Sequence, residues 1–326
     1  MNKGTKIFLI VLFALNSIYS GAQNESPLLP FFNPLIVNPA FAGMDKISSF
    51  RTGNQYSLAN SASSYNLFYA TYDTYSEKLK GGIAFYFQQG LIGSRNISTT
   101  ELGFAYAGIP KKTNTGVINF GFNTNILLAT KQWIIAFTDK FTVDGRDTPN
   151  PPGTDLLRYS LIKPRVSFLW HMPDLVWGAS LGSSLKINLS TEESSDKQFP
   201  FNASLYVAKN SEGFRKGLHS QPFVIIPELM IYYTDMYLLG RLNLYTEFTS
   251  STLGVFLNGD FLNNEYSVGG IGGLASNNFR LNLALGTGYS VSANKVGFTG
   301  ELSLILKVQQ FDYSKINPWA PRLKSK

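Results

Sequence analysis

Hydrophobic and polar residues alternate along most of this chain with a period of two. In the stretch FRLNLALGTGYSV, residues 279–291, large apolar side chains occupy most odd positions, whereas the even positions carry polar or small residues. A period of two places successive side chains on opposite faces of an extended strand. The stretch is also long, because strands of soluble domains typically have about five or six residues. The pattern therefore predicts long strands, each with one apolar face and one polar or small face.

Similar runs follow one another from Ser48 to about Val308, and about fourteen of them can be distinguished. Each run with its turn has about 22 residues, which suits transmembrane β-strands of about 9–11 residues joined by turns and loops. We therefore predict an all-β protein, a closed antiparallel transmembrane β-barrel of about 14 strands over residues 48–308. Closure leaves no strand edge unpaired in hydrocarbon. The longest gap, 130–159, is predicted to be an outer loop.

Two environments could receive the apolar faces, a lipid bilayer or the core of a soluble β-sandwich. Only 15% of the residues are charged, whereas about 25% is usual for soluble domains. A mean hydropathy of −0.02 excludes a bundle of membrane helices. We expect the apolar faces to meet lipid. In the run 65–72 the alternation places four residues on one such face: Tyr65, Leu67, Tyr69 and Thr71.

The opposite faces favour the lumen of a barrel, because glycines and charged residues gather there in the middle of the predicted strands. These charged residues are Glu101, Arg165, Lys186, Glu228, Arg241, Glu247, Asp260, Arg280, Glu301 and Lys307. Opposite charges on neighbouring strands can pair across a lumen. Arg280 with Glu301, and Arg241 with Glu228, are therefore predicted to form lumenal charge pairs.

The N-terminus indicates export. Lys3 and Lys6 precede the apolar run 7–15, and the small residues Ser20 and Ala22 suit a cut before Gln23. This order of features predicts a secretory signal peptide over residues 1–22. The apolar run is too short to span a bilayer, which takes about 20 residues.

Residues 23–47 form a Pro-rich segment, with prolines at positions 27, 30, 34 and 39. Proline is unfavourable inside helices and central strands, so neither is expected here. We predict an N-terminal periplasmic segment that precedes the barrel. Residues 309–326 are predicted to be a basic C-terminal periplasmic tail, so that both termini lie in the periplasm.

Candidate catalytic chemistry is nearly absent. The chain has two histidines, His171 and His219, and no cysteine, so it has neither a zinc-spaced histidine pair nor a disulfide framework. The stretch GGIGG, 269–273, lacks the lysine and helix of a phosphate loop and is interpreted as a lumenal strand. We predict no enzymatic activity and no catalytic, cofactor-binding or metal-binding residues. Nucleic-acid binding is not expected of an exported barrel.

Basic residues accumulate in the turns that strand parity places at the periplasmic end and in the tail. They are Lys78, Lys80, Lys111, Lys112, Lys209, Arg215, Lys216, Lys315, Arg322, Lys324 and Lys326. Such a rim can dock an acidic periplasmic partner. Simple solvation of the turns by lysine explains it equally well.

The opening of the predicted mature chain carries a family resemblance. NPLIVNPAFAG, residues 33–43, is similar to the start of the PorP/SprF family, outer-membrane proteins of the type IX secretion and gliding-motility apparatus. The matching element is Asn38, Pro39, Ala40, Phe41, Ala42 and Gly43. The stretch 81–107 resembles the family's next hairpin. An Arg-x-Gln-Trp-like sequence usually follows the opening element, and here RTGNQY, 51–56, keeps the arginine but departs in spacing and lacks the tryptophan.

The resemblance implies an outer-membrane β-barrel that supports protein secretion or anchors a large exported adhesin at the cell surface. Other secretion components, the adhesin and the surrounding lipid would be its partners, and the matched element is a candidate partner contact. Two alternatives stay open on the residues alone. One is a passive outer-membrane pore for small solutes, and the other is a secreted carbohydrate-binding β protein.

Overall fold

The computed structural model describes residues 28–30, 32–58, 65–92, 97–108, 111–113, 115–131, 157–187, 201–209, 224–234, 237–248, 250–262, 264–276, 278–291 and 294–308. The predicted signal peptide, the C-terminal tail and most of the predicted outer loop lie outside these residues. Among the described residues, no helix is long and apolar enough to cross a membrane.

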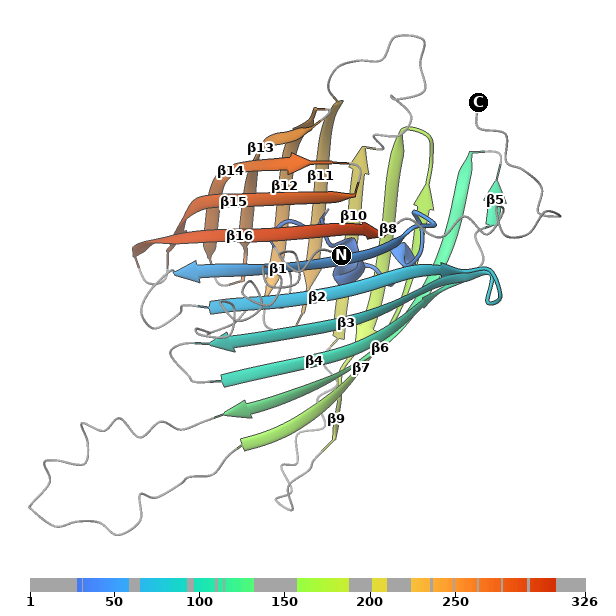
Figure 1. Ribbon diagram of the computed structural model, residues 1–326. Coiled ribbons are helices and arrows are strands. Elements are labelled where there is room, and N and C mark those ends of the chain that lie inside the picture. Colours follow the sequence, from blue (N-terminus) through green and yellow to red (C-terminus); the bar gives the residue numbers. More distant parts are fainter. Residues whose placement is uncertain are drawn as a thin grey trace, which may run out of the picture.

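The described strands form a closed antiparallel β-barrel of 14 long strands, as the sequence predicts (Figure 1). These strands are β1 (Ser48–Leu58), β2 (Tyr65–Ser76), β3 (Gly81–Ile92), β4 (Ile97–Ala107), β6 (Gly116–Lys131), β7 (Leu157–His171), β8 (Leu175–Ser183), β10 (Phe201–Lys209), β11 (Val224–Tyr233), β12 (Leu238–Glu247), β13 (Ser251–Asp260), β14 (Glu265–Ala275), β15 (Phe279–Ser290) and β16 (Lys295–Val308). Two short strands extend the wall, β5 (Lys111–Thr113) beside β6 and β9 (Leu185–Ile187) beside β7.

Neighbours in the barrel are neighbours in the sequence, except where the ring closes. There β1 pairs with β16, so that Ser48 lies opposite Val308 and Leu58 opposite Phe298. We call the two rims the Ser48 end and the Leu58 end. Because the strands alternate in direction, the gap between β6 and β7 lies at the Leu58 end, opposite to the rim at which β1 begins.

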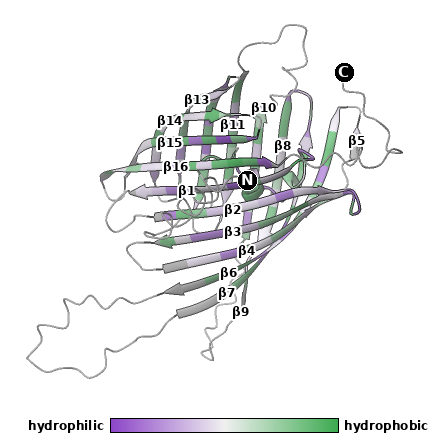
Figure 2. Cartoon of the chain, viewed as in Figure 1, coloured by the Kyte–Doolittle hydropathy of each residue, from purple (hydrophilic) through white to green (hydrophobic). Residues whose placement is uncertain are grey.

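Side chains alternate between the two faces of the wall as expected. Outward-facing Phe85 and Leu253 are more than half exposed, whereas inward-facing Ala84 and Asn282 are fully buried. Figure 2 shows the resulting alternation of hydrophobic and hydrophilic positions along the strands. The charged residues Glu228, Arg241, Glu247 and Glu301 all face inward and are buried. Apolar residues outside and polar residues inside are what a membrane barrel requires.

One strand has the opposite phase to that expected. In β2, Leu67, Tyr69 and Thr71 face inward and are buried, while Tyr72 faces outward and is exposed. The prediction assumed that apolar residues always face lipid, and it was wrong here because inward-facing residues of β2 have partners inside the barrel. The Tyr69 hydroxyl donates to Glu301, and the Thr71 hydroxyl donates to Asn33 of the N-terminal segment.

The second correction concerns that segment. Of this segment, residues 28–30 and 32–44 lie within the barrel and not ahead of it, between its front and back walls in Figure 1. They also contain two short helices that the prolines were expected to prevent, α2 (Pro34–Val37) and the 3₁₀ helix η1 (Pro39–Phe41). Proline occupies the first position of each helix, where its missing N–H is not needed and its fixed φ is already helical.

Candidate functional site

Residues 28–30 and 32–44 of the N-terminal segment form a plug inside the lumen. Leu28, Leu29 and Phe32 are at most 2% exposed and pack in one apolar cluster with inward-facing wall residues. The wall residues of this cluster are Phe256, Ile271, Ala284 and Ile305, from β13 to β16. Leu35 and Val37 belong to two further clusters formed with other parts of the wall. The plug therefore supplies an apolar core that links distant sides of the barrel.

Polar wall residues bind the backbone of the plug at several points. The Leu29 N–H donates to Glu301 Oε2 at 3.0 Å. The carbonyl of Ile36 accepts a bond from Arg165 Nη1 at 2.8 Å, and the carbonyl of Val37 accepts one from Ser204 Oγ at 3.1 Å. Buried backbone groups outside regular structure need such partners, because leaving one unpaired costs about 1–3 kcal/mol. The irregular segment is thus held by groups that the strands place in the lumen.

The six residues of the family element, 38–43, form the part of this plug that lies towards the Ser48 end, which we call its base. Asn38 caps η1, since its Oδ1 accepts from the Ala40 N–H at 2.9 Å, and its Nδ2 donates to the carbonyl of Phe168 at 2.9 Å. The Ala40 N–H also reaches Ser167 Oγ at 3.1 Å. Pro39, Ala40, Ala42 and Gly43 are buried, and Phe41 packs edge-on against Tyr206 with ring centroids 5.4 Å apart. In this arrangement the element contacts the barrel wall.

Glycines in the wall make room for the element. A Cβ on Gly178 would lie 2.6 Å from Asn38 Nδ2, and one on Gly121 would lie 2.7 Å from Ala40 Cα. A Cβ on Gly82 would lie 2.7 Å from the backbone nitrogen of Gly43 and would collide with the carbonyl of Ala42. These glycines, on β8, β6 and β3, form a socket. It lets the Asn38 side chain and the backbone of residues 40–43 lie directly against the backbone of the wall strands.

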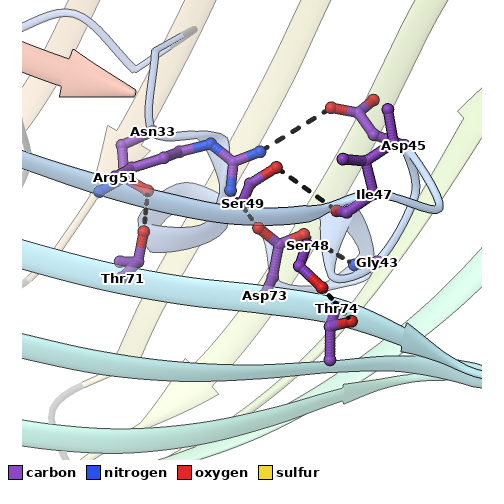
Figure 3. Close-up of polar contacts among 10 residues, drawn as sticks. All are labelled: Asn33, Gly43, Asp45, Ile47, Ser48, Ser49, Arg51, Thr71, Asp73 and Thr74. Carbon is purple, nitrogen blue, oxygen red and sulfur yellow. Dashed lines mark hydrogen bonds and ion pairs between the residues drawn. The ribbon is translucent and has the colours of Figure 1, made fainter. Parts of the chain in front are cut away.

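Gly43 ends the element in a conformation that suits glycine. Its φ is +63°, and a Cβ there would lie 2.6 Å from Gly82 Cα and 2.8 Å from the carbonyl oxygen of Thr74. Its N–H donates to Asp73 Oδ2 at 3.0 Å, and Asp73 Oδ1 forms an ion pair with Arg51 Nη1 (Figure 3). Arg51 also lies 3.9 Å from the carboxylate of Asp45. The arginine that RTGNQY retains therefore tethers the end of the plug to β1 and β2.

Loss of the Arg51 side chain should destabilise the barrel. Arg51 and Asp73 are 8% and 1% exposed, and removing one partner of a buried ion pair typically costs about 3–5 kcal/mol. We expect Arg51→Met to lower the free energy of unfolding by such an amount, measured by urea unfolding in detergent with tryptophan fluorescence.

The control is Arg51→Met combined with Asp73→Asn, which keeps an acceptor for the Gly43 N–H and removes the uncompensated charge. It should recover part of the loss. A single variant as stable as the wild type would contradict this role of the pair.

Arg280 and Glu301, which were predicted to form a charge pair, have other partners in the structure. In the register of β15 and β16, Arg280 lies opposite Ile305 and Glu301 lies opposite Ala284, so the two are four positions apart along the strands. Arg280 Nη1 instead lies 2.5 Å from Glu247 Oε1. Glu301 accepts a bond from the hydroxyl of Tyr69 at 2.6 Å in addition to that from the plug. Glu301 thus serves the plug.

Arg241 and Glu228 face the lumen on adjacent strands, two positions out of register. Arg241 Nε donates to Asn258 Oδ1 at 3.0 Å, and Glu228 Oε2 accepts from Asn243 Nδ2 at 3.2 Å. Diagonal neighbours of this kind lie within reach of long side chains. A direct pair between them stays a prediction.

Several residues that hold the plug escaped the sequence reasoning. Asp73 was missed because the run was taken to end at Tyr72, whereas β2 continues to Ser76. Arg165 was noticed as a charge inside an alternating run, and that signal was correct for a lumenal position. Ser167 and the socket glycines carry no comparable signal, because serine and glycine also fill lumenal faces elsewhere in the barrel.

One stretch of the wall has the sequence of a catalytic motif. Residues 178–182 read Gly-Ala-Ser-Leu-Gly, and a hydrolase nucleophile elbow has the pattern Gly-x-Ser-x-Gly on a sharp strand-to-helix turn. Here the stretch is part of β8, and Ser180 Oγ is buried, donates to the carbonyl of Val37 at 3.3 Å and lies 2.7 Å from Ser204 Oγ. Ser180 therefore binds the plug.

Metal chemistry has no evident site either. Within the described ranges, no group of three or more His, Asp or Glu side chains is arranged to hold a metal ion.

Of the predicted basic rim, Lys78, Lys80 and Lys209 lie at the Ser48 end, as do Lys111 and Lys112 through β5. The other rim residues lie outside the described residues, so the rim as a whole stays a prediction.

Comparison with known proteins identifies a family and a fold. The family model for the type IX secretion system membrane protein PorP/SprF matches residues 27–306. No curated protein sequence was found to match. The solved structure of CymD, a monoaromatic hydrocarbon channel, covers 89% of this chain and 95% of its own at 9% identity, with a TM-score of 0.51. At that identity the likeness concerns the fold alone.

Two further structures are less similar. TodX, a monoaromatic hydrocarbon channel solved as a deltaS2 mutant, has 11% identity and a TM-score of 0.46, covering 88% of this chain and 95% of its own. CdiB from Acinetobacter baumannii has 10% identity and a TM-score of 0.43 over 80% of this chain. The match spans only 60% of the length of CdiB.

Proposed function

This chain belongs to the PorP/SprF family of type IX secretion system membrane proteins, and from that premise we propose that it is a non-enzymatic outer-membrane component that supports the secretion or surface anchoring of an exported protein such as a large adhesin. Its partners are other components of the secretion system and the exported protein. Both termini are proposed to lie in the periplasm, with the Ser48 end and its basic rim facing that side.

The observation that carries the proposal is the filled lumen. A passive pore needs a continuous aqueous path, and porin lumens are polar and water-filled. Here the chain's own residues 28–30 and 32–44 occupy the interior, with Leu28, Leu29 and Phe32 in an apolar cluster that reaches four strands. This supports a barrel that works through partners. The fold shared with CymD gives no argument for transport.

Recovery of the partner tests the proposal. Deleting Asn38–Gly43 should abolish co-purification of a large exported polypeptide with the tagged barrel, because the base of the plug loses its contacts. The barrel should still show heat-modifiable migration on gels, since its wall is formed by strand pairing. Loss of both together would show that the element is only structural, and unchanged partner recovery would argue against the proposed role.

The position of the family element inside the barrel limits how a partner can contact it. In the plugged barrel the six residues lie against the wall, so a partner can touch them directly only after the segment leaves the lumen. A contact that needs no such movement would use the rims. A second variant, Lys78→Glu/Lys80→Glu, alters the Ser48 rim and leaves the plug in place, and it should still recover the partner if the family element makes the contact. Loss of the partner in this variant alone would assign the contact to the rim.

A further inference from the structure

The outward face of the barrel is hollowed on one side. An apolar hollow of about 640 Å³ lies across β11 to β16 near the Leu58 end. Two adjacent rows of outward-facing residues line it. The register connects Ile231, Gly240, Gly259, Tyr266, Tyr289 and Val296 into one row. The other row runs from Leu229 through Val268 to Thr287.

Two glycines of the wall lie beneath the aromatic rings that border the hollow. Gly240 and Gly259 lie opposite each other on β12 and β13, between the bulky residues Ile231 and Tyr266. Phe261 lies over them, since a Cβ on Gly240 would be 2.7 Å from its ring, and the Phe261 and Tyr266 rings meet at a centroid distance of 6.2 Å. The two aromatic rings therefore close one side of the hollow.

A shallow strip continues from the hollow along β14. Gly270 and Gly272 lie on the same outward phase as Val268, with leucine or valine opposite them on β13 and β15. A Cβ on Gly272 would meet no atom within 4 Å. Gly270 and Gly272 therefore leave the outward face of β14 without side chains next to the hollow.

We propose that this hollow binds an acyl chain of the lipid A part of lipopolysaccharide, an inference that rests on the proposed orientation, in which the Leu58 end lies in the outer leaflet. The hollow opens onto the outward face, which in an outer-membrane barrel meets hydrocarbon, so its occupant comes from the bilayer. The charged group nearest to it in the wall, Arg241, is 1% exposed and donates to Asn258 on the lumenal side. The volume is within the range of about 300–1,000 Å³ that is typical of ligand pockets.

An acyl chain fits the chemistry better than a protein segment does. An empty apolar hollow forfeits the dispersion contacts of its lining atoms, and a chain of methylene groups restores them without hydrogen-bond partners. A strand or loop of a partner would need hydrogen-bond partners for the part of its polar backbone that enters the hollow. The hollow offers little polar surface for that purpose, whereas the tyrosines Tyr266 and Tyr289 suit the boundary with the headgroups.

Retention of lipid in native mass spectrometry tests the proposal. The full-length protein would be loaded with purified lipid A in a mild detergent and then exchanged into lipid-free detergent. We expect the wild type to retain one lipid per barrel. Val268→Trp, which fills the hollow, should reduce the retained fraction at least about tenfold, the equivalent of about 1.4 kcal/mol.

The control is Val166→Trp, which adds the same side chain on the outward face of β7, away from the hollow, and should retain the lipid. Thr287→Trp is the second filling variant and decides the matter if Val268→Trp does not fold, as judged by heat-modifiable migration. A wild type that retains no lipid, or filling variants that retain as much as the wild type, would overturn the proposal. A membrane protein that co-purifies with the wild type and is lost in the filling variants would also overturn it.

Discussion

Removal of residues 28–43 is expected to turn a barrel that conducts little or no current into one with a steady open conductance. The deletion takes away both the apolar filling around Phe32 and the base of the plug, and it exposes lumenal charges such as Glu301, Arg165 and Asp73. A polar lumen of this size fills with water. The strands should still pair, because every ladder of the barrel runs between wall strands and none includes the plug.

Planar-bilayer recordings of the purified protein provide the measurement, with heat-modifiable migration as the test of folding. The matched control removes residues 309–326, a similar length of chain that follows the last barrel strand, and it should leave the conductance low. A folded deletion variant that stays closed would show that the plug does not block the lumen. A wild type with steady open conductance would favour the passive pore.

Placing a side chain in the glycine socket should displace the plug without shortening the chain. Gly82→Leu would force its Cβ into the carbonyl of Ala42, and backbone on both sides leaves no flexible group to move away. Overpacking of a close-packed site typically costs about 1–3 kcal/mol. We expect the base of the plug to leave the socket and the barrel to conduct.

Cysteine labelling measures this displacement directly, because the chain has no cysteine of its own. A reporter at Leu35, 1% exposed in the plug, should resist a water-soluble maleimide in the wild-type background and react in the Gly82→Leu background. Gly272→Leu is the matched control, since it adds the same side chain to the same kind of residue on the outward face, where a Cβ meets open space. Equal protection of the reporter in the wild-type and Gly82→Leu backgrounds would refute the role of the glycine socket in holding the plug.

The strands themselves were predictable because their signal is local. Runs such as 116–131 and 279–290 alternate so regularly that the type of each residue indicates which face of the strand its side chain occupies. The prediction failed in β2, where Tyr69 and Leu67 face inward. No local signal distinguishes a tyrosine that faces lipid from one that faces the lumen and bonds to Glu301, two strands away along the wall.

The candidate site was predictable in part. The resemblance identified Asn38–Gly43 as the distinctive element, and the alternation placed Arg165 and Glu301 on the lumenal faces. Neither signal could show that the N-terminal segment contacts these lumenal residues, because the bond between Leu29 and Glu301 connects residues 272 positions apart. Asn38 and Phe168 are 130 positions apart. The prolines were informative about local conformation, but they were consistent with a segment outside the barrel as well as within it.

By itself, the sequence determined which residues face lipid and which face the interior over most of the wall, because a strand's period of two is fixed by backbone geometry. It also indicated that strands cross the membrane, because runs of alternating apolar and polar residues recur along most of the chain. Only the tertiary structure decided what the interior contains. The pairing of the strands from β3 to β8 brings Gly82, Gly121 and Gly178 around one short segment, and such a meeting of distant residues leaves no periodic trace in the chain.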